Sequence, residues 1–275
     1  MNPRILALTH RNLLMLVGTA AIACVLFWPP SGAEGTRGVS ALVMLSIFLS
    51  ATISNIAGFA FSAIAGGSIL HLINNPVEAV KVLIVSSIAI QAYSVLVLWR
   101  TIAWRPLLPF LLGGAAMIPA GIWLLLNASA GAYWKGMGVF LVVYALVMMV
   151  RGRPAICRGN VLIDAAAGAL GGITGGAAGF PGAFVTIWCG MRGWDKNRQR
   201  TVYQPYILAM QLMTIFGLEF AGNAHTYDFV LLQYAPAALL GAYCGLVIFR
   251  RLEDRHFNII IYVLLMISGA TLIAK

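Results

Sequence analysis

The sequence predicts an all-α protein that crosses a membrane many times, and its composition is the first reason. Apolar residues make up 61% of the 275 residues and charged residues only 9%, with a mean hydropathy of +0.90. Soluble domains carry about 25% charged residues. At about 20 residues per spanning helix, the chain has room for roughly ten crossings joined by short loops. These values exclude a soluble enzyme, a nucleic-acid binder and a disordered segment.

The first apolar run, Asn12–Trp28, predicts an extra N-terminal helix, and a polar turn extends from there through Gly38. A secretory signal peptide is the competing interpretation, but the run has no clear small-residue cleavage site. We therefore expect residues 1–38 to hold a retained anchor helix and its loop.

The rest of the chain contains two long apolar segments that glycine interrupts, and three uninterrupted runs follow each of them. The first, Val39–Ile73, is broken around Gly58, and the second, Val161–Gly190, is broken at Gly179–Gly182. This order predicts two repeats, residues 39–150 and 151–275, each with one broken helical segment and three transmembrane helices. The uninterrupted runs are Pro76–Trp99, Pro106–Leu126, Ala132–Val150, Thr201–Ala221, Phe229–Phe249 and Phe257–Ala274.

Matching residues at a constant spacing indicate that the two repeats arose by duplication. A match between two leucines is weak evidence for a duplication, because leucine is common in such a chain. A paired glutamine and a paired Gly-Phe break in the same order are stronger evidence. The pairs 120 positions apart include Gln91 with Gln211 and Gly121 with Gly241, and Ala57-Gly58-Phe59 matches Ala178-Gly179-Phe180 at 121 positions.

The basic residues lie in short loops, which is typical of the positive-inside rule and accounts for the net charge of +10. All basic loops fall in the cytoplasm only if each broken segment begins and ends on the same side, as a helical hairpin. The two hairpins then enter from opposite faces, which makes the repeats inverted, as in secondary transporters. This topology puts the N-terminus in the cytoplasm and the C-terminus in the periplasm. The basic stretches are the N-terminus, Arg100–Arg105, Arg151–Arg158, Arg192–Arg200 and Arg250–Arg255.

The two breaks are the first candidates for a functional site. Broken backbone inside a membrane is tolerated only where protein buries it or where it lines a wet cavity. We expect the tips, Asn55–Phe59 and Gly179–Gly182, to meet at mid-membrane depth. A helix that starts just after each tip would aim its first N–H groups at an anion, and Pro181 suits such a first turn. Close helix packing is the favoured alternative for the other glycines, namely Gly168, Gly171, Gly172, Gly175 and Gly176.

Gln91 and Gln211 are the second candidates, because a polar amide in the middle of a span needs a partner. Hydrogen bonding between helices and contact with a substrate remain two open interpretations of this pair. Weaker candidates of the same kind are Tyr203, Gln204 and Tyr206, together with Thr52 and Ser54 near the first tip. The predicted substrate-binding residues are Asn55, Gly58, Phe59, Gln91, Gly179, Phe180, Pro181, Gly182 and Gln211.

We expect no metal, no cofactor and no enzymatic activity. The four histidines and four cysteines are widely scattered along the sequence and match no metal-binding spacing. No nucleophile and base stand out as a pair. The ionisable residues Glu78, Lys81, Asp164 and Glu219 lie near the ends of their runs, where snorkelling or a helix-end role is favoured.

The duplicated layout and the glycine-rich stretch Gly171–Gly182, before Trp194 and a basic loop, resemble the sulfite exporter TauE/SafE family, also called toluene-sulfonate uptake permeases. The resemblance extends from about Val39 to Ala274. It implies a permease or exporter of small sulfur-containing anions such as sulfite, sulfoacetate, thiosulfate or sulfonates.

We therefore expect a multi-pass transporter in a bacterial inner membrane. Neutral donors at the predicted residues would bind the anion, and rocking of the two repeats would give alternating access. An anion channel of the same fold is one alternative, and a non-transporting membrane scaffold or intramembrane enzyme is another. The expected partners are the small anion and the lipid bilayer, with no nucleic acid. The small-residue faces would also allow a homo-oligomer.

Overall fold

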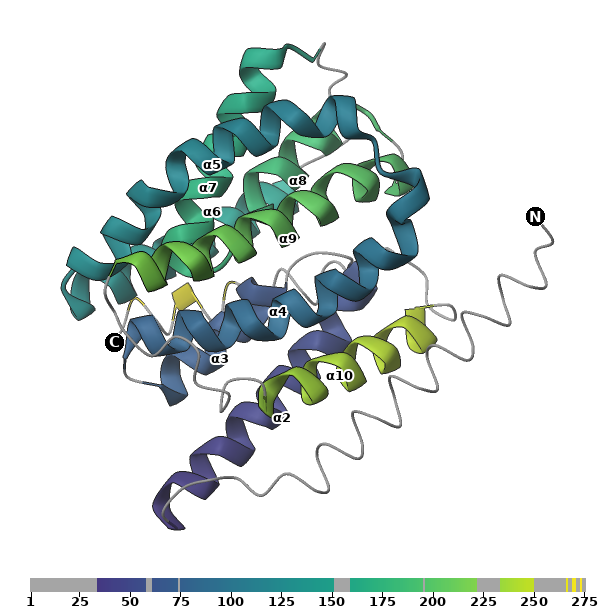
Figure 1. Cartoon of the computed structure of the whole chain (residues 1–275). Coiled ribbons are helices and arrows are strands. Elements are labelled where there is room, and N and C mark those ends of the chain that lie inside the picture. The colour runs from purple at the N-terminus through teal and green to yellow at the C-terminus, as the bar shows by residue number, and fades with distance from the viewer. Residues whose placement is uncertain are drawn as a thin grey trace.

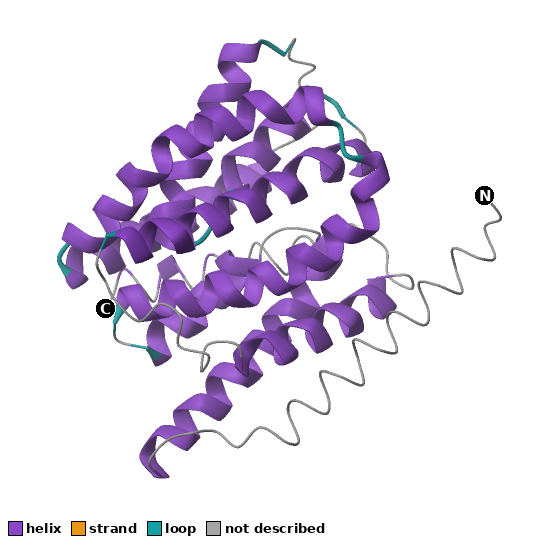
Figure 2. Ribbon diagram, in the orientation of Figure 1, coloured by secondary structure: helices purple, strands orange, loops and turns teal. Residues whose placement is uncertain are grey.

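The structure, a computed structural model, is built from helices. It describes residues 34–57, 61–73, 75–150, 159–194, 196–221 and 233–249, with Met266, Gly269, Ala270 and Ile273 near the C-terminus. These ranges contain no strand (Figure 2), so the predicted all-α class is confirmed. The anchor helix expected at Asn12–Trp28 and most of the last run, Phe257–Ala274, lie outside the described residues.

The second broken segment contains a break between two helices at the residues where glycine predicts it, because α7 ends at Ala178 and α8 begins at Gly182. In the first broken segment α2 extends to Ala57 and α3 begins at Phe61, and the predicted break at Gly58 lies outside the described residues. The described elements are α2 (Glu34–Ala57), α3 (Phe61–Leu72), α4 (Pro76–Leu98), η1 (Trp99–Thr101), α5 (Trp104–Asn127), α6 (Ala130–Val150), α7 (Val161–Ala178), α8 (Gly182–Met191), α9 (Lys196–Phe220) and α10 (Tyr234–Phe249).

Two helices start earlier than the apolar runs predict. Helix α2 begins at Glu34, inside the expected polar turn, and α9 begins at Lys196, inside the expected basic loop. The reason is that hydropathy reports which residues are compatible with lipid, whereas a helix continues into polar sequence once it has left the hydrocarbon.

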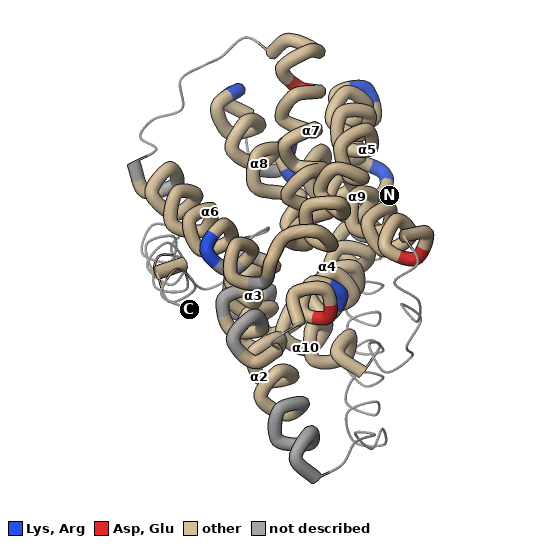
Figure 3. The backbone as a smooth tube through the Cα atoms, turned by 90° about the vertical axis from the view of Figure 1, so that its left-hand side faces the viewer, with Lys and Arg blue, Asp and Glu red and all other residues tan. Residues whose placement is uncertain are grey.

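Several features of the described helices fit a bilayer. The segments Pro76–Leu96, Trp104–Asn127 and Val161–Ala178 are long and apolar enough to span one. The charged residues lie near helix ends (Figure 3). Large apolar side chains such as those of Leu112 and Phe220 are exposed on the outside. Such an apolar exterior is stable in lipid and not in water. The chain is therefore a multi-pass helical membrane protein.

Helix α7 packs against α5 with the two backbones in direct contact. A Cβ atom added at Gly172 would lie 2.2 Å from the carbonyl oxygen of Gly114, and one at Gly168 would lie 2.2 Å from that of Phe110. Small residues allow this approach. On the adjacent face of α7, Gly171 and Gly175 meet Pro181 instead. The glycines of α7 therefore serve packing, as the alternative interpretation predicted.

The helices form two groups, each of which contains helices from both predicted repeats (Figure 1). Helix α5 packs on α7, and α10 packs on α2, while α4 and α9 contact each other between the groups. One group thus holds α5, α7, α8 and α9, and the other holds α2, α3, α4 and α10. The spatial division does not follow the predicted sequence boundary at residue 150.

An ion pair ties the two ends of the second broken segment together. Asp164 lies in the first turn of α7, and Arg192 directly follows α8, yet Nη1 of Arg192 lies 2.9 Å from Oδ2 of Asp164. The indole Nε1 of Trp188 also donates to Oδ1 of Asp164 at 2.6 Å. The chain therefore doubles back at residues 179–181. We call α7, this turn and α8 the second hairpin, and the end with the ion pair its base.

We expect Gly172→Ala to destabilise the protein, because the new methyl group would force α5 and α7 apart. Overpacking of this kind costs about 1–3 kcal/mol. The loss can be measured as a lower thermal midpoint in detergent, with a thiol-reactive dye that reports exposure of the buried thiol of Cys189. Gly136→Ala is the matched control, because a Cβ at Gly136 meets nothing within 4 Å. Equal midpoints for the two variants would contradict the backbone contact.

We expect Asp164→Ala to destabilise the second hairpin, because it leaves the Arg192 guanidinium and the Trp188 indole without an acceptor. Removing one partner of a buried ion pair costs about 3–5 kcal/mol, and the 19% exposure of Arg192 should place this site near the lower limit. The same thermal assay measures the effect. The double variant Asp164→Leu/Arg192→Met should be more stable than the single one, since it leaves no buried charge unpaired. An equally unstable double variant would show that the ion pair is not the cause.

Candidate functional site

The turn of the second hairpin depends on a glycine in the left-handed region. Gly179 has φ +63°, and its N–H donates to the carbonyl of Gly175 at 2.9 Å. The next N–H, that of Phe180, donates to the carbonyl of Thr174 at 3.2 Å. Such a turn closes a helix by satisfying its last carbonyls, and glycine adopts it without steric cost. The amides of Gly179 and Phe180 are therefore used by α7, and in this structure they are not available to an anion.

Helix α8 begins immediately after this turn with free N–H groups. Pro181 is its N-cap, one position before the first turn that the sequence predicts for it, and no side chain caps the helix. The first N–H groups of an α-helix, here those of Gly182 and its successors, have no partner within the helix. They form the positive end of the helix dipole. Gly182 is thus the predicted tip residue whose amide can still meet an anion.

The turn lies between α4 and α9. A Cβ added at Gly179 would lie 3.0 Å from Cγ1 of Ile84 on α4, and one at Gly182 would lie 2.7 Å from Cδ1 of Ile207 on α9. These two helices are also joined directly, because Nε2 of Gln211 donates to Oγ of Ser87 at 2.7 Å. Ser87 and Gln211 follow Ile84 and Ile207 by about one helical turn. The second tip and the predicted glutamine therefore lie about one turn apart along the same helices.

Buried polar atoms without partners gather on these helices. Gln91 is 5% exposed and Gln211 1%, and Oε1 of each has no hydrogen-bond partner. Oγ of the fully buried Ser86 has none either. Leaving a buried polar group unsatisfied costs about 1–3 kcal/mol. Such atoms are costly in the middle of a membrane protein, and a bound polar ligand would remove part of that cost.

The first tip is described only on its two sides. Gly58 and Phe59 lie outside the described residues, and Asn55 is in the last turn of α2. The hydroxyl of Ser54 donates to the carbonyl of Ala51, and that of Thr52 to the carbonyl of Phe48. These two weaker candidates therefore bond to their own helix.

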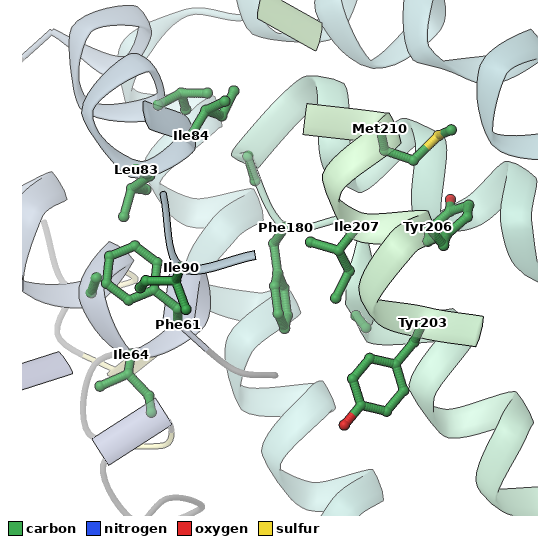
Figure 4. Close-up of a cluster of buried hydrophobic side chains, with 14 of the residues drawn as sticks. Phe61, Ile64, Leu83, Ile84, Ile90, Phe180, Tyr203, Tyr206, Ile207 and Met210 are labelled. Carbon is green, nitrogen blue, oxygen red and sulfur yellow. The ribbon is translucent and has the colours of Figure 1, made fainter. Parts of the chain in front are cut away.

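Apolar side chains fill the space around the second turn (Figure 4). The ring of Phe180 lies 5.4 Å from that of Tyr144 and 6.0 Å from that of Phe140, both on α6. Phe61, which opens α3 after the first tip, belongs to the same buried cluster, together with Ile90 of α4. The segments that follow both tips thus contribute to one core.

Sequence reasoning missed the serines of α4. Ser86 and Ser87 interrupt an apolar run about one turn before Gln91, and this i, i+4 spacing puts Ser87 and Gln91 on one face of the helix. That spacing was a signal available in the sequence. Within the described part of the chain, no three His, Cys, Asp or Glu side chains come together to hold a metal ion.

The fold and this site define a class of protein, a polytopic membrane protein with broken helices at a buried polar centre. The chain belongs to the TauE/SafE sulfite exporter family, whose model matches residues 43–272. This confirms the family that the glycine-rich stretch indicates. The family is one of membrane exporters and not of enzymes. Comparison with curated proteins and with solved structures gives no match.

Proposed function

We propose that this protein is a secondary transporter that moves a small sulfur-containing oxyanion, such as sulfite, thiosulfate or an organosulfonate, across a bacterial inner membrane. The observation that carries the proposal is the pair of buried side-chain oxygens, Oε1 of Gln91 and Oε1 of Gln211, which have no hydrogen-bond partner and belong to the two helices that flank the uncapped start of α8. The family supports the substrate class, since its name is that of a sulfite exporter.

Neutral donors suit this substrate. Oxyanions bind well to backbone N–H groups at a helix start, without a formal positive charge. The amide of Gln211 can contribute as well: if it turns by 180°, Ser87 donates to Oε1, and both N–H bonds of Gln211 point elsewhere. Binding without a buried Lys or Arg is weak enough to allow release. The described Lys and Arg residues lie near helix ends, as Figure 3 shows.

The packing of the helices supports two inverted repeats. The contact of α5 with α7 and that of α10 with α2 change places when the two repeats are exchanged. The paired glycines take part in the same way, because a Cβ at Gly121 would lie 2.3 Å from the carbonyl oxygen of Ile173, and one at Gly241 would lie 2.3 Å from that of Phe48. Ser94 and Thr214, 120 positions apart, each donate to the carbonyl four residues earlier.

Alternating access follows from this arrangement. The apolar cluster around Phe180 and Phe61 closes the polar centre, so we interpret the structure as an occluded state. The group of α5, α7, α8 and α9 would rock against the group of α2, α3, α4 and α10, and the seam between α4 and α9 would open on one side at a time. The positive-inside rule puts the base of the second hairpin in the cytoplasm.

We expect Gln91→Leu and Gln211→Leu to reduce anion flux strongly while the protein stays folded. A hydrogen bond to a charged group contributes about 1.5–3 kcal/mol, which corresponds to about a 10- to 150-fold loss in affinity. The measurement is uptake of ³⁵S-sulfite into proteoliposomes under anaerobic conditions, with thiosulfate and sulfoacetate as competitors. Counterflow against a gradient distinguishes a transporter from a channel, because a channel cannot concentrate its ion.

Gln233→Leu is the matched control, since Gln233 lies directly before α10 rather than within it and should keep wild-type flux. Unchanged flux in both Gln91→Leu and Gln211→Leu would remove these residues from the site. A wild-type protein that moves none of the three anions would contradict the proposed function itself.

A further inference from the structure

A second set of buried polar atoms lies between the turn of the second hairpin and its base. Thr186 on α8 and Gln204 on α9 are each 4% exposed. Oγ1 of Thr186 and Oε1 of Gln204 have no hydrogen-bond partner. Neither residue belongs to the central pair Gln91 and Gln211. Two helices in contact thus hold two polar groups without hydrogen-bond partners, and the proposed central site does not include either of them.

The two groups lie at the same depth, because α8 and α9 run in opposite directions. Gly182 of α8 meets Ile207 of α9 next to the turn. Thr186 follows Gly182 by four residues toward the base, and Gln204 precedes Ile207 by three residues in the same direction. Each is therefore about one helical turn from the tip.

Positive charge lies farther along the same path. At the base Arg192 pairs with Asp164. The guanidinium groups of Arg192 and Arg198 lie 4.3 Å and 4.8 Å from the ring centroid of Trp194. Arg200 hydrogen-bonds to Tyr203, whose ring projects from α9 beside Phe180 and Ile207 (Figure 4). Among the charged residues that the structure describes here, these three arginines outnumber the one aspartate, Asp164, which favours an anion over a cation on this side.

The first repeat has no counterpart of this polar pair. At the spacing of the repeats, Gln204 corresponds to Ile84 and Thr186 corresponds to Ala65. Both of these residues are buried and apolar. The unsatisfied groups on the base side of the tip are therefore a property of the second repeat.

We propose that Thr186 and Gln204 form a second anion subsite, about one helical turn from Gly182 at the tip and about two turns from Gln211, which holds the oxyanion between the central site and the base of the second hairpin. The hydroxyl of Thr186 donates to the anion, and the amide of Gln204 turns its N–H groups toward it. This subsite rests on the proposed function, since it takes the same substrate. It gives the transporter an additional binding position for the anion, on the side of the second hairpin's base only.

The test is equilibrium binding of ³⁵S-sulfite to the purified full-length protein in lipid nanodiscs. We expect two sulfite ions per wild-type chain and one for Thr186→Val and for Gln204→Leu. Thr186→Ser keeps the hydroxyl and should restore the second ion. Thr214→Val is the matched control, because the hydroxyl of the buried Thr214 is already bonded to the carbonyl of Met210 at 2.8 Å, and it should keep both ions.

The outcomes separate the subsite from the central site. A wild-type chain that transports sulfite and binds one ion, or two ions that both Thr186→Val and Gln204→Leu retain, overturns the subsite alone. A wild-type chain that binds and transports no sulfite overturns the proposed function as well. We expect each subsite variant to lose one ion and to lose the other only when Gln211→Leu is added. That result supports both the subsite and the proposed function.

Discussion

The structure depends on how a helix can end inside a membrane. Lipid offers no hydrogen bonds, so each peptide group freed by a break needs a partner within the protein. At Gly179 a left-handed turn returns two amides to the carbonyls of Gly175 and Thr174, near the end of α7. The next helix, α8, starts without a side-chain cap, and the first amides of a helix have no partner within it. The two sides of the break therefore differ, and the proposed anion site depends on that difference.

Close backbone contact supports this turn. Since Gly168 and Gly172 allow α7 to touch α5, and Gly171 and Gly175 accept Pro181 on the neighbouring face, the hairpin is held from two directions. The ion pair of Asp164 with Arg192 closes its other end. A hairpin fastened at the tip and at the base is expected to move as one body, which is what transport by rocking of rigid groups needs.

The sequence predicted the parts of this fold that follow from local composition. Glycine and proline inside apolar runs indicate the break at Gly179–Gly182, and amides within spans single out Gln91 and Gln211, because both depend on residue type alone. Contacts between residues far apart in the sequence could not be predicted from local composition. Nothing in the spacing shows that Gln211 meets Ser87, that Arg192 meets Asp164, or that the amides of Gly179 and Phe180 turn back onto α7. Helix starts in polar sequence, such as Glu34 and Lys196, were missed because hydropathy does not report them.

The packing of α2 against the distant helix α10 has a consequence for biogenesis. Helix α2 emerges early from the ribosome, but its packing partner α10 is synthesised only after all the intervening helices. During translation the face of α2 that will meet Gly241 has to remain in contact with lipid or with an insertion factor. The first half therefore cannot mature by itself, and assembly is completed only when the second half arrives.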